Sequence, residues 1–261
     1  MTSRDGGCTW SEPRPYGEAC GPVRAKPIRL ADGRLLAGNS EEKTTDRLRW
    51  RTFVDVSTDD GAHFSRLAPI PIENVEGAKR ATQYLLTTGC RRVAVVGVHP
   101  GEKVGSAALR YQGYLEALEE AGVEFDDRLV VESGMWHRSD GVRAMNALLD
   151  SGVEVDGVVA LNDMLASGVM HAIQMHGLHI PDDISVVGFD NSDDSQYLSP
   201  ALTSIAPGLE AVARLSVKVL KERIDGRDPN ADKPGEKVFR KVASSLVVRQ
   251  STKLPIDSLV L

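Results

Sequence analysis

Beyond residue 51 the chain alternates between two hydrophobic patterns. Short runs of β-branched apolar residues, such as Val93-Ala-Val-Val-Gly-Val98, are typical of strands that are buried on both faces of a sheet. The stretches between these runs carry apolar residues three or four positions apart, which predicts amphipathic helices. We expect strands at 53–56, 92–98, 129–132, 157–161, 184–189 and 245–249, and helices at 74–89, 106–120, 141–149, 164–175 and 209–224.

The order of these elements predicts the class of fold. Strands that alternate with helices of about 10 to 15 residues indicate right-handed crossovers and a parallel sheet. The fold class is therefore α/β, with a doubly wound parallel sheet. Within it, Asn74 is a candidate N-cap for the first helix, and Gly89 is a candidate end of that helix.

The first 50 residues differ from the rest of the chain. They contain six glycines and four prolines without a sustained apolar period, a composition that favours turns and mobile segments. One short hairpin is compatible with 28–36, because Asp32-Gly33 suits a type I′ turn. We therefore divide the chain into an irregular, disorder-prone segment at 1–50, a domain at 51–252 and a tail at 253–261.

Composition and charge narrow the class of protein. The 261 residues are 41% hydrophobic and 26% charged, as in an ordinary soluble globular protein. No run of about 18 apolar residues predicts a transmembrane helix, and the first residues lack the apolar stretch of a signal peptide. The net charge of −6 is not the electrostatic footprint of a dedicated nucleic-acid binder. Three widely spaced cysteines suit a reducing compartment, so we expect a cytoplasmic protein with no metal and no cofactor.

Polar residues follow three of the predicted strands directly. They are His99, the pair Asn162 and Asp163, and Asp190. Because ligands bind beyond the carboxyl ends of the strands in an open parallel sheet, these residues are candidate ligand contacts. Helix capping is the alternative interpretation for Asn162 and Asp163. Asp190 precedes no obvious helix, which favours ligand binding for that residue.

Five motifs carry a family resemblance, and one of them is the segment Ser106-Ala-Ala-Leu-Arg110-Tyr-Gln-Gly-Tyr114. The chain contains Ile180-Pro-Asp-Asp-Ile-Ser-Val-Val-Gly-Phe-Asp190 and Tyr197-Leu-Ser-Pro-Ala-Leu-Thr-Ser-Ile205, together with Val158-Val-Ala-Leu-Asn-Asp163 and Leu246-Val-Val-Arg249. In order and spacing these motifs resemble the LacI/GalR family of bacterial transcription regulators over about residues 53–252. The resemblance implies a periplasmic-binding-protein-like sensor fold of type I, with the C-terminal subdomain complete and the N-terminal subdomain partial.

The resemblance also implies which residues contact an effector. The family's contacts fall on Arg110, Asn162 and Asp190, and Asp163 adjoins them. Trp136 lies where some members place an aromatic ring against a sugar. A carboxylate accepts hydrogen bonds from hydroxyl groups, a guanidinium donates them, and an indole face covers the apolar side of a sugar ring. The alternative interpretations are a surface helix position for Arg110 and a packing role for Trp136.

The chain departs from the family pattern at its beginning. Family members start with a helix-turn-helix headpiece, and no pair of short amphipathic helices precedes residue 53. DNA is therefore an expected partner only where a headpiece is present, and not for this chain alone. A truncated or frameshifted gene product is one hypothesis for this difference.

The leading functional hypothesis is the ligand-sensing domain of a LacI/GalR-type transcription regulator. It would bind a sugar or a related small metabolite, form a homodimer as the family does, and have no membrane partner. The runner-up is a sugar-binding protein of a transporter, which shares the fold and needs export. An α/β enzyme is disfavoured, because no nucleophile–base pair or metal-ligand set is identifiable.

Overall fold

The computed structural model describes residues 28–29, 33, 35–43, 49–57, 65–66, 72–103, 105–224 and 242–255. The chain divides into two compact units, residues 1–70 with 216–240 and residues 71–215 with 241–261. Much of the segment at 1–50 and part of the tail lie outside the described residues, as do Cys8 and Cys20. The domain boundaries expected at 51 and 252 stay a prediction.

The second unit contains a six-stranded α/β sheet that is mostly parallel. The alternating pattern predicted five of its strands, but it missed the strand at 203–206 and the antiparallel pairing of the last strand. Its order is β10-β9-β8-β7-β5-β6, and all neighbours are parallel except β10, which pairs antiparallel with β9. The chain passes from β5 to β6 and then returns to the other side of β5 to form β7. The winding therefore reverses between β5 and β7. The strands are β5 (Val93–Val98), β6 (Val130–Glu132), β7 (Gly157–Ala160), β8 (Ser185–Phe189), β9 (Thr203–Ala206) and β10 (Ser245–Val247).

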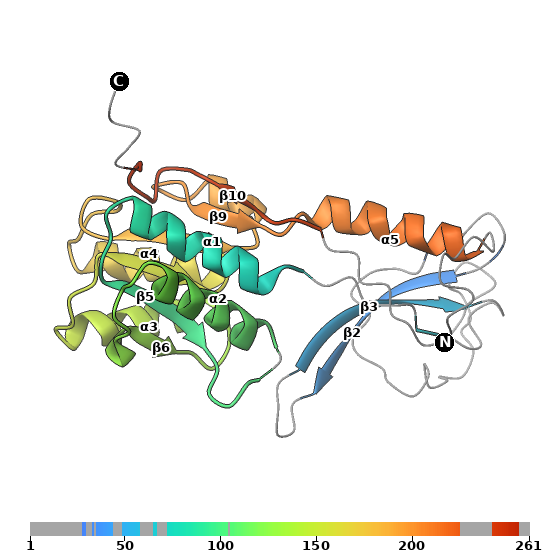
Figure 1. Ribbon diagram of the computed structural model, residues 1–261, viewed down its shortest axis with the longest axis horizontal. Helices are drawn as coiled ribbons and strands as arrows, with labels where there is room; N and C mark the ends of the chain where they lie inside the picture. The colour runs from blue at the N-terminus through green and yellow to red at the C-terminus, as the bar shows by residue number, and fades with distance from the viewer. Residues whose placement is uncertain are drawn as a thin grey trace, which may run out of the picture. The chain divides into compact units, whose positions relative to one another are not determined.

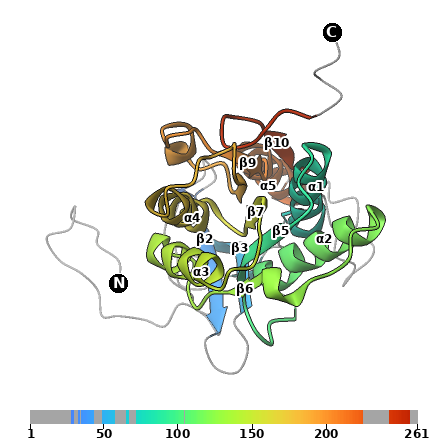
Figure 2. The same cartoon turned by 90° about the vertical axis from the view of Figure 1, so that its left-hand side faces the viewer.

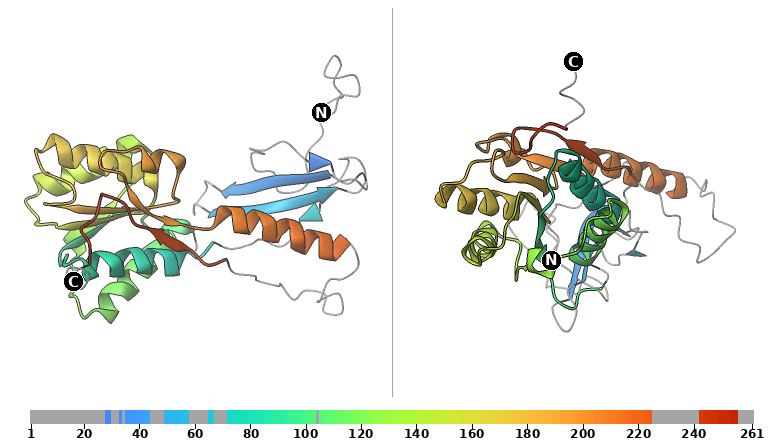
Figure 3. Two further views of the ribbon diagram at one scale, coloured as in Figure 1. Left: turned by 90° about the horizontal axis from the view of Figure 1, so that it is seen from above. Right: turned by 60° about the vertical axis from the view of Figure 1, so that its left-hand side comes forward.

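Four helices form the layers on either side of this sheet. In Figures 1 and 2, α1 and α2 lie on one face and α3 and α4 on the other, and Figure 3 shows the two pairs from above. No helix among the described residues is long and apolar enough to cross a membrane. These four helices are α1 (Asn74–Thr87), α2 (Ser106–Glu120), α3 (Arg138–Asp150) and α4 (Asp163–Met175). A fifth helix, α5 (Leu209–Ile224), follows β9, and η1 (Asp127–Leu129) and η2 (Asp193–Gln196) are short 3-10 turns.

The two sheet faces share their strands but build separate cores. Successive residues of a strand point to opposite faces, so a strand covered on both sides must be apolar throughout. The core under α1 and α2 uses Val93, Val95, Val159, Val187, Ala81, Leu85 and Tyr114. The core under α3 and α4 uses Ala94, Val96, Val158, Val186, Met145, Leu165 and Ile173. This alternation explains why the strand segments read as continuous apolar runs.

The first unit contains a different kind of sheet. Strands β1 (Ile28–Arg29), β2 (Leu35–Lys43), β3 (Arg49–Ser57) and β4 (Ser65–Arg66) pair antiparallel in chain order. Ile28 pairs with Leu36, which confirms the hairpin considered at 28–36, and the strand predicted at 53–56 lies within β3. The long β2–β3 pair within the Gly- and Pro-rich region was not predicted.

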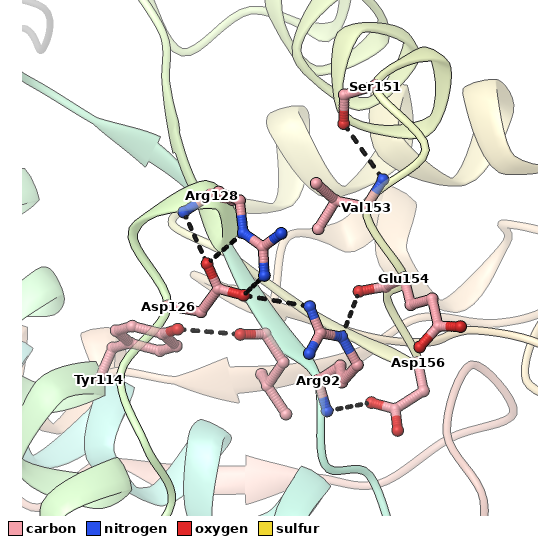
Figure 4. A network of polar contacts seen from close by, with 9 residues as sticks. Arg92, Tyr114, Asp126, Arg128, Ser151, Val153, Glu154 and Asp156 are labelled. Atoms are coloured by element: carbon pink, nitrogen blue, oxygen red, sulfur yellow. Dashed lines mark hydrogen bonds and ion pairs between the residues drawn. The ribbon is translucent and has the colours of Figure 1, made fainter.

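Polar side chains connect the segments that lead into the parallel strands. The guanidinium of Arg92 donates to the Glu154 carbonyl at 2.8 Å and to the Asp126 carboxylate at 3.1 Å (Figure 4). Asp156 accepts from the backbone N–H of Arg92 at 2.9 Å. The hydrogen bond from Arg128 holds the pKa of Asp126 well below its ordinary value. This edge of the sheet therefore uses its polar groups to tie strands and loops together.

Two glycines allow the helices of each layer to approach closely. A Cβ atom on Gly113 of α2 would lie 2.1 Å from the Val75 carbonyl oxygen of α1. A Cβ atom on Gly168 of α4 would lie 2.0 Å from the Arg138 carbonyl oxygen of α3. Both obstacles are backbone atoms, which cannot move aside as a flexible side chain can.

We predict that Gly168→Ala lowers the free energy of unfolding by about 2–3 kcal/mol, because the added methyl group forces α3 and α4 apart. Gly134→Ala is the matched control, since nothing lies within 4 Å of its Cβ position. Urea denaturation followed by circular dichroism measures both variants. Equal midpoints for the two variants would show that the helix pair accommodates the methyl group.

Candidate functional site

The predicted site residues converge at the carboxyl ends of the parallel strands. Arg110 of α2 donates to the carbonyl oxygen of Leu161, directly after β7, and to Asp190, directly after β8. Trp136 lies between β6 and α3, and its backbone carbonyl accepts from the Asn162 side chain at 3.3 Å. The strand ends involved include those of β5 and β7, where the winding reverses. In open α/β sheets such a switch point is where ligands bind.

Arg110 is the centre of this arrangement. Its side chain is 5% exposed, so the surface interpretation of this helix residue was wrong. Its Nε donates to Asn74 Oδ1 at 2.8 Å, and one terminal nitrogen reaches Asp190 Oδ1 at 3.4 Å. The predicted capping role of Asn74 was also wrong: Glu73 is the N-cap of α1, and the Asn74 side chain serves the guanidinium instead.

Aromatic rings cover the faces of the Arg110 guanidinium. Its Cζ lies 3.6 Å from the ring centre of Phe189 and 5.3 Å from that of Trp136. Burial lowers the pKa of Arg110, whereas the charge of Asp190 and its hydrogen bond raise it. An arginine remains protonated under such shifts. The site therefore holds a permanent positive charge with little contact to water.

Asp190 is the most exposed charged group in the cluster. Its side chain is 43% exposed, and Arg110 is its one side-chain hydrogen-bond partner among the described residues. Partial burial raises the pKa of Asp190 to about 6, the charge of Asp163 acts in the same direction, and Arg110 opposes both. Its backbone has a φ of 113°, a conformation that side-chain-bearing residues rarely adopt and that concentrates at functional sites. The carboxylate is thus accessible and incompletely paired.

Asp163 has a different environment from Asp190. It is buried, and both of its carboxylate oxygens accept hydrogen bonds from the protein. The hydroxyl groups of Ser204 and Ser195 each donate at 2.6 Å, and the backbone N–H of Ser192 donates at 2.7 Å. These contacts tie the start of α4 to the loop after β8 and to β9. The geometry favours a supporting role for Asp163.

Asn162 and Trp136 also make contacts within the protein. Asn162 is the N-cap of α4, and its Oδ1 accepts from the backbone N–H of Leu165 at 2.8 Å, which confirms the capping interpretation. Trp136 is half-buried and donates from Nε1 to the Gly97 carbonyl at 2.8 Å. Its indole packs against both hydrophobic cores. Whether these two residues touch an effector stays a prediction.

Two members of the cluster, Phe189 and Asn74, were not predicted from the sequence as site residues. Phe189 lies inside the motif at 180–190, but only the folded structure shows that its ring contacts Arg110. Asn74 lies outside every motif and far from Arg110 in sequence. His99, a candidate ligand contact because it directly follows β5, lies near the cluster: its ring centre is 5.5 Å from that of Trp136.

A model of the periplasmic binding protein-like domain matches residues 82–252. The HTH-type transcriptional regulator CelR of Thermobifida fusca is 34% identical over 191 residues, which are 73% of this chain and 54% of that protein. The chain thus spans about half the length of the curated relatives that it matches.

Solved structures agree with this match. A LacI-family regulator from Sanguibacter keddieii is 42% identical with a TM-score of 0.63, covering 70% of this chain and 67% of that one. A complex of the regulator CelR with cellobiose is 33% identical with a TM-score of 0.62, covering 71% of this chain and 54% of that one.

A second model, of the BNR repeat-like domain, matches residues 1–135. Its C-terminal part overlaps the first match over 82–135, where the chain forms the α/β layers of the six-stranded sheet. The antiparallel strands β1 to β4 lie in the part that this model alone matches. The segments 3–10 and 57–64 both read Ser-x-Asp-x-Gly-x-x-aromatic, which is a short internal repeat.

The assignment of the chain to a family rests on the part of the chain that contains the candidate site. The match over residues 82–252 covers the parallel sheet and α2, which carries Arg110. The chain therefore belongs to the LacI family of transcriptional regulators, through its periplasmic binding protein-like domain.

Proposed function

We propose that the second unit is the effector-sensing part of a LacI-type transcription regulator and that it binds a sugar at the carboxyl edge of its sheet. The observation that carries this proposal is the pairing of buried Arg110 with accessible Asp190 at the strand ends. CelR, whose complex holds cellobiose, is among the similar proteins, and this supports a sugar as the ligand class.

The residues at this edge have the chemistry that a sugar requires. The Asp190 carboxylate accepts hydrogen bonds from neighbouring hydroxyl groups, and Arg110 has N–H groups left to donate to sugar oxygens. The indole of Trp136 offers an apolar face for the ring of the sugar. Asn162 and Asp163 hold the loops in place behind these groups. A charged acceptor, a charged donor and one aromatic face together favour a ligand that is uncharged and carries several hydroxyl groups.

In this proposal the protein acts in the cytoplasm as a dimer and regulates transcription by a population shift. The effector binds one arrangement of the regulator better and so biases the form that binds DNA. We expect no specific DNA binding from this chain alone, because its net charge is −6 and specific binding needs Lys and Arg contacts to phosphates. Catalysis has no support, since the similar proteins are regulators. A transporter's sugar-binding protein is not favoured for the same reason.

We predict that Asp190→Asn weakens sugar binding about tenfold to a hundredfold, because charge-assisted hydrogen bonds contribute about 1.5–3 kcal/mol and about 1.4 kcal/mol is one decade of affinity. Calorimetric titration with cellobiose, D-glucose and D-ribose measures this loss. Asp194→Asn is the matched control, because Asp194 lies in the following loop and pairs with Arg138 in an exposed ion pair. The control should bind as the wild type does.

Two results would contradict the proposed function. One is the absence of binding of any of these sugars to the wild type. The other is a sugar that binds the wild type and Asp190→Asn with equal affinity, which would place the ligand elsewhere.

We predict that Asp163→Ala lowers the free energy of unfolding by about 3 kcal/mol, since three donors lose a buried charged acceptor. Ser192→Ala is a useful comparison, because it keeps the backbone N–H that Asp163 accepts from. Thermal unfolding without sugar compares the two variants. A midpoint for Asp163→Ala equal to that of the wild type would remove the supporting role.

A further inference from the structure

His99 lies at the point where the winding of the sheet reverses. It is the first residue after β5, and a glycine bulge sets the direction of the chain there. The β5–β6 register shifts between Val96 and Val98, and Gly97 has a φ of 117°. A bulge next to a functional site is a common way to aim a side chain. The carbonyl of Gly97 also anchors Trp136, so the two rings share one support.

The His99 ring is oriented by a carboxylate. His99 Nδ1 lies 2.9 Å from Glu102 Oε2. The other oxygen of Glu102 accepts from the backbone N–H groups of Ala107 and Ala108 in the first turn of α2, at 3.1 and 3.4 Å. Glu102 is thereby held as an acceptor at a helix N-terminus, where negative charge is favoured. In the neutral ring, Nδ1 then carries the hydrogen and Nε2 is left as an acceptor.

That acceptor is unused by the described part of the chain. Nε2 of His99 is buried and has no hydrogen-bond partner there. A buried polar atom without a partner costs free energy, and a ligand that pairs with it would remove that cost. Glu102 already caps α2 without help from the far side of the ring. The ring centre of His99 is 5.5 Å from that of Trp136, which in turn lies 5.3 Å from Arg110 Cζ.

We propose that His99 is a further ligand-contacting residue of this site, whose Nε2 accepts a hydrogen bond from a hydroxyl group of the bound sugar. Glu102 is a positioning residue that fixes the ring and its tautomer. This inference rests on the proposed function and adds a determinant of specificity to it. Arg110 supplies donors at this edge, and Asp190 and His99 supply acceptors. The three groups together select a ligand with hydroxyl groups on more than one side.

The test compares two substitutions in the full chain. In His99→Asn, the side-chain amide lies near the position of Nδ1, and no polar atom replaces Nε2. In His99→Gln, the longer side chain brings its amide to the position of Nε2. We expect cellobiose to bind His99→Asn about tenfold more weakly than the wild type, a loss of about 1.4 kcal/mol. His99→Gln should recover most of that loss. His176→Asn is the matched control, because both ring nitrogens of His176 have partners in the protein.

A second readout separates contact from folding. Monodeoxy analogues of cellobiose lack one hydroxyl group each, and for one of them the penalty seen in the wild type should vanish in His99→Asn. A merely structural histidine would weaken all the analogues equally. If the wild type binds cellobiose and His99→Asn binds it equally well, or with a uniform loss, the assignment of His99 fails while the proposed function stands. If the wild type binds no sugar, both fail.

Discussion

The burial of one guanidinium group organises the edge of the sheet that carries the site. A buried positive charge is tolerated only when acceptors and a counter-charge surround it. For Arg110 these come from three directions: the side chain of Asn74 at the start of α1, the carbonyl of Leu161 after β7, and Asp190 after β8. The same contacts therefore hold α1, α2 and two strand ends together.

Asp190 is the member of this set that is left incompletely paired. Its pKa of about 6 exceeds the ordinary value of 3.8, so the folded protein binds its proton more tightly than the unfolded chain does. The free energy of unfolding therefore falls as the pH rises between these two values, and the ionised carboxylate destabilises the ligand-free protein near neutral pH. Hydroxyl groups that donate to the charged form would offset this effect. At the opposite edge of the sheet, Arg92 and Asp156 make hydrogen bonds with neighbouring protein groups, as Figure 4 shows.

Periodicity alone predicted the helices of the second unit and five of its six strands, because two covered faces require continuous apolar strands; it missed β9, whose four residues include Thr203 and Ser204. It also placed Asn162, Asp163 and Asp190 at one edge, since parallel strands end together. It separated Asp163 from Asp190 only through the helix that follows Asp163. It could not show that Asp163 is buried and fully paired, because that depends on Ser195 and Ser204, which only the folded loops bring near Asp163. The antiparallel sheet of the first unit was missed, apart from one hairpin and one strand, because its Gly- and Pro-rich segments carry no regular apolar period.

The most direct test of this account is a carbon-detected NMR titration of the Asp190 carboxylate, with and without saturating sugar. We predict a pKa near 6 in the free protein, caused by partial burial beside Asp163, and a lower pKa when hydroxyl groups of a sugar stabilise the charged form. A pKa near 3.8 in the free protein, or a value that bound sugar does not change, would contradict the claim that this carboxylate is held ready for a ligand.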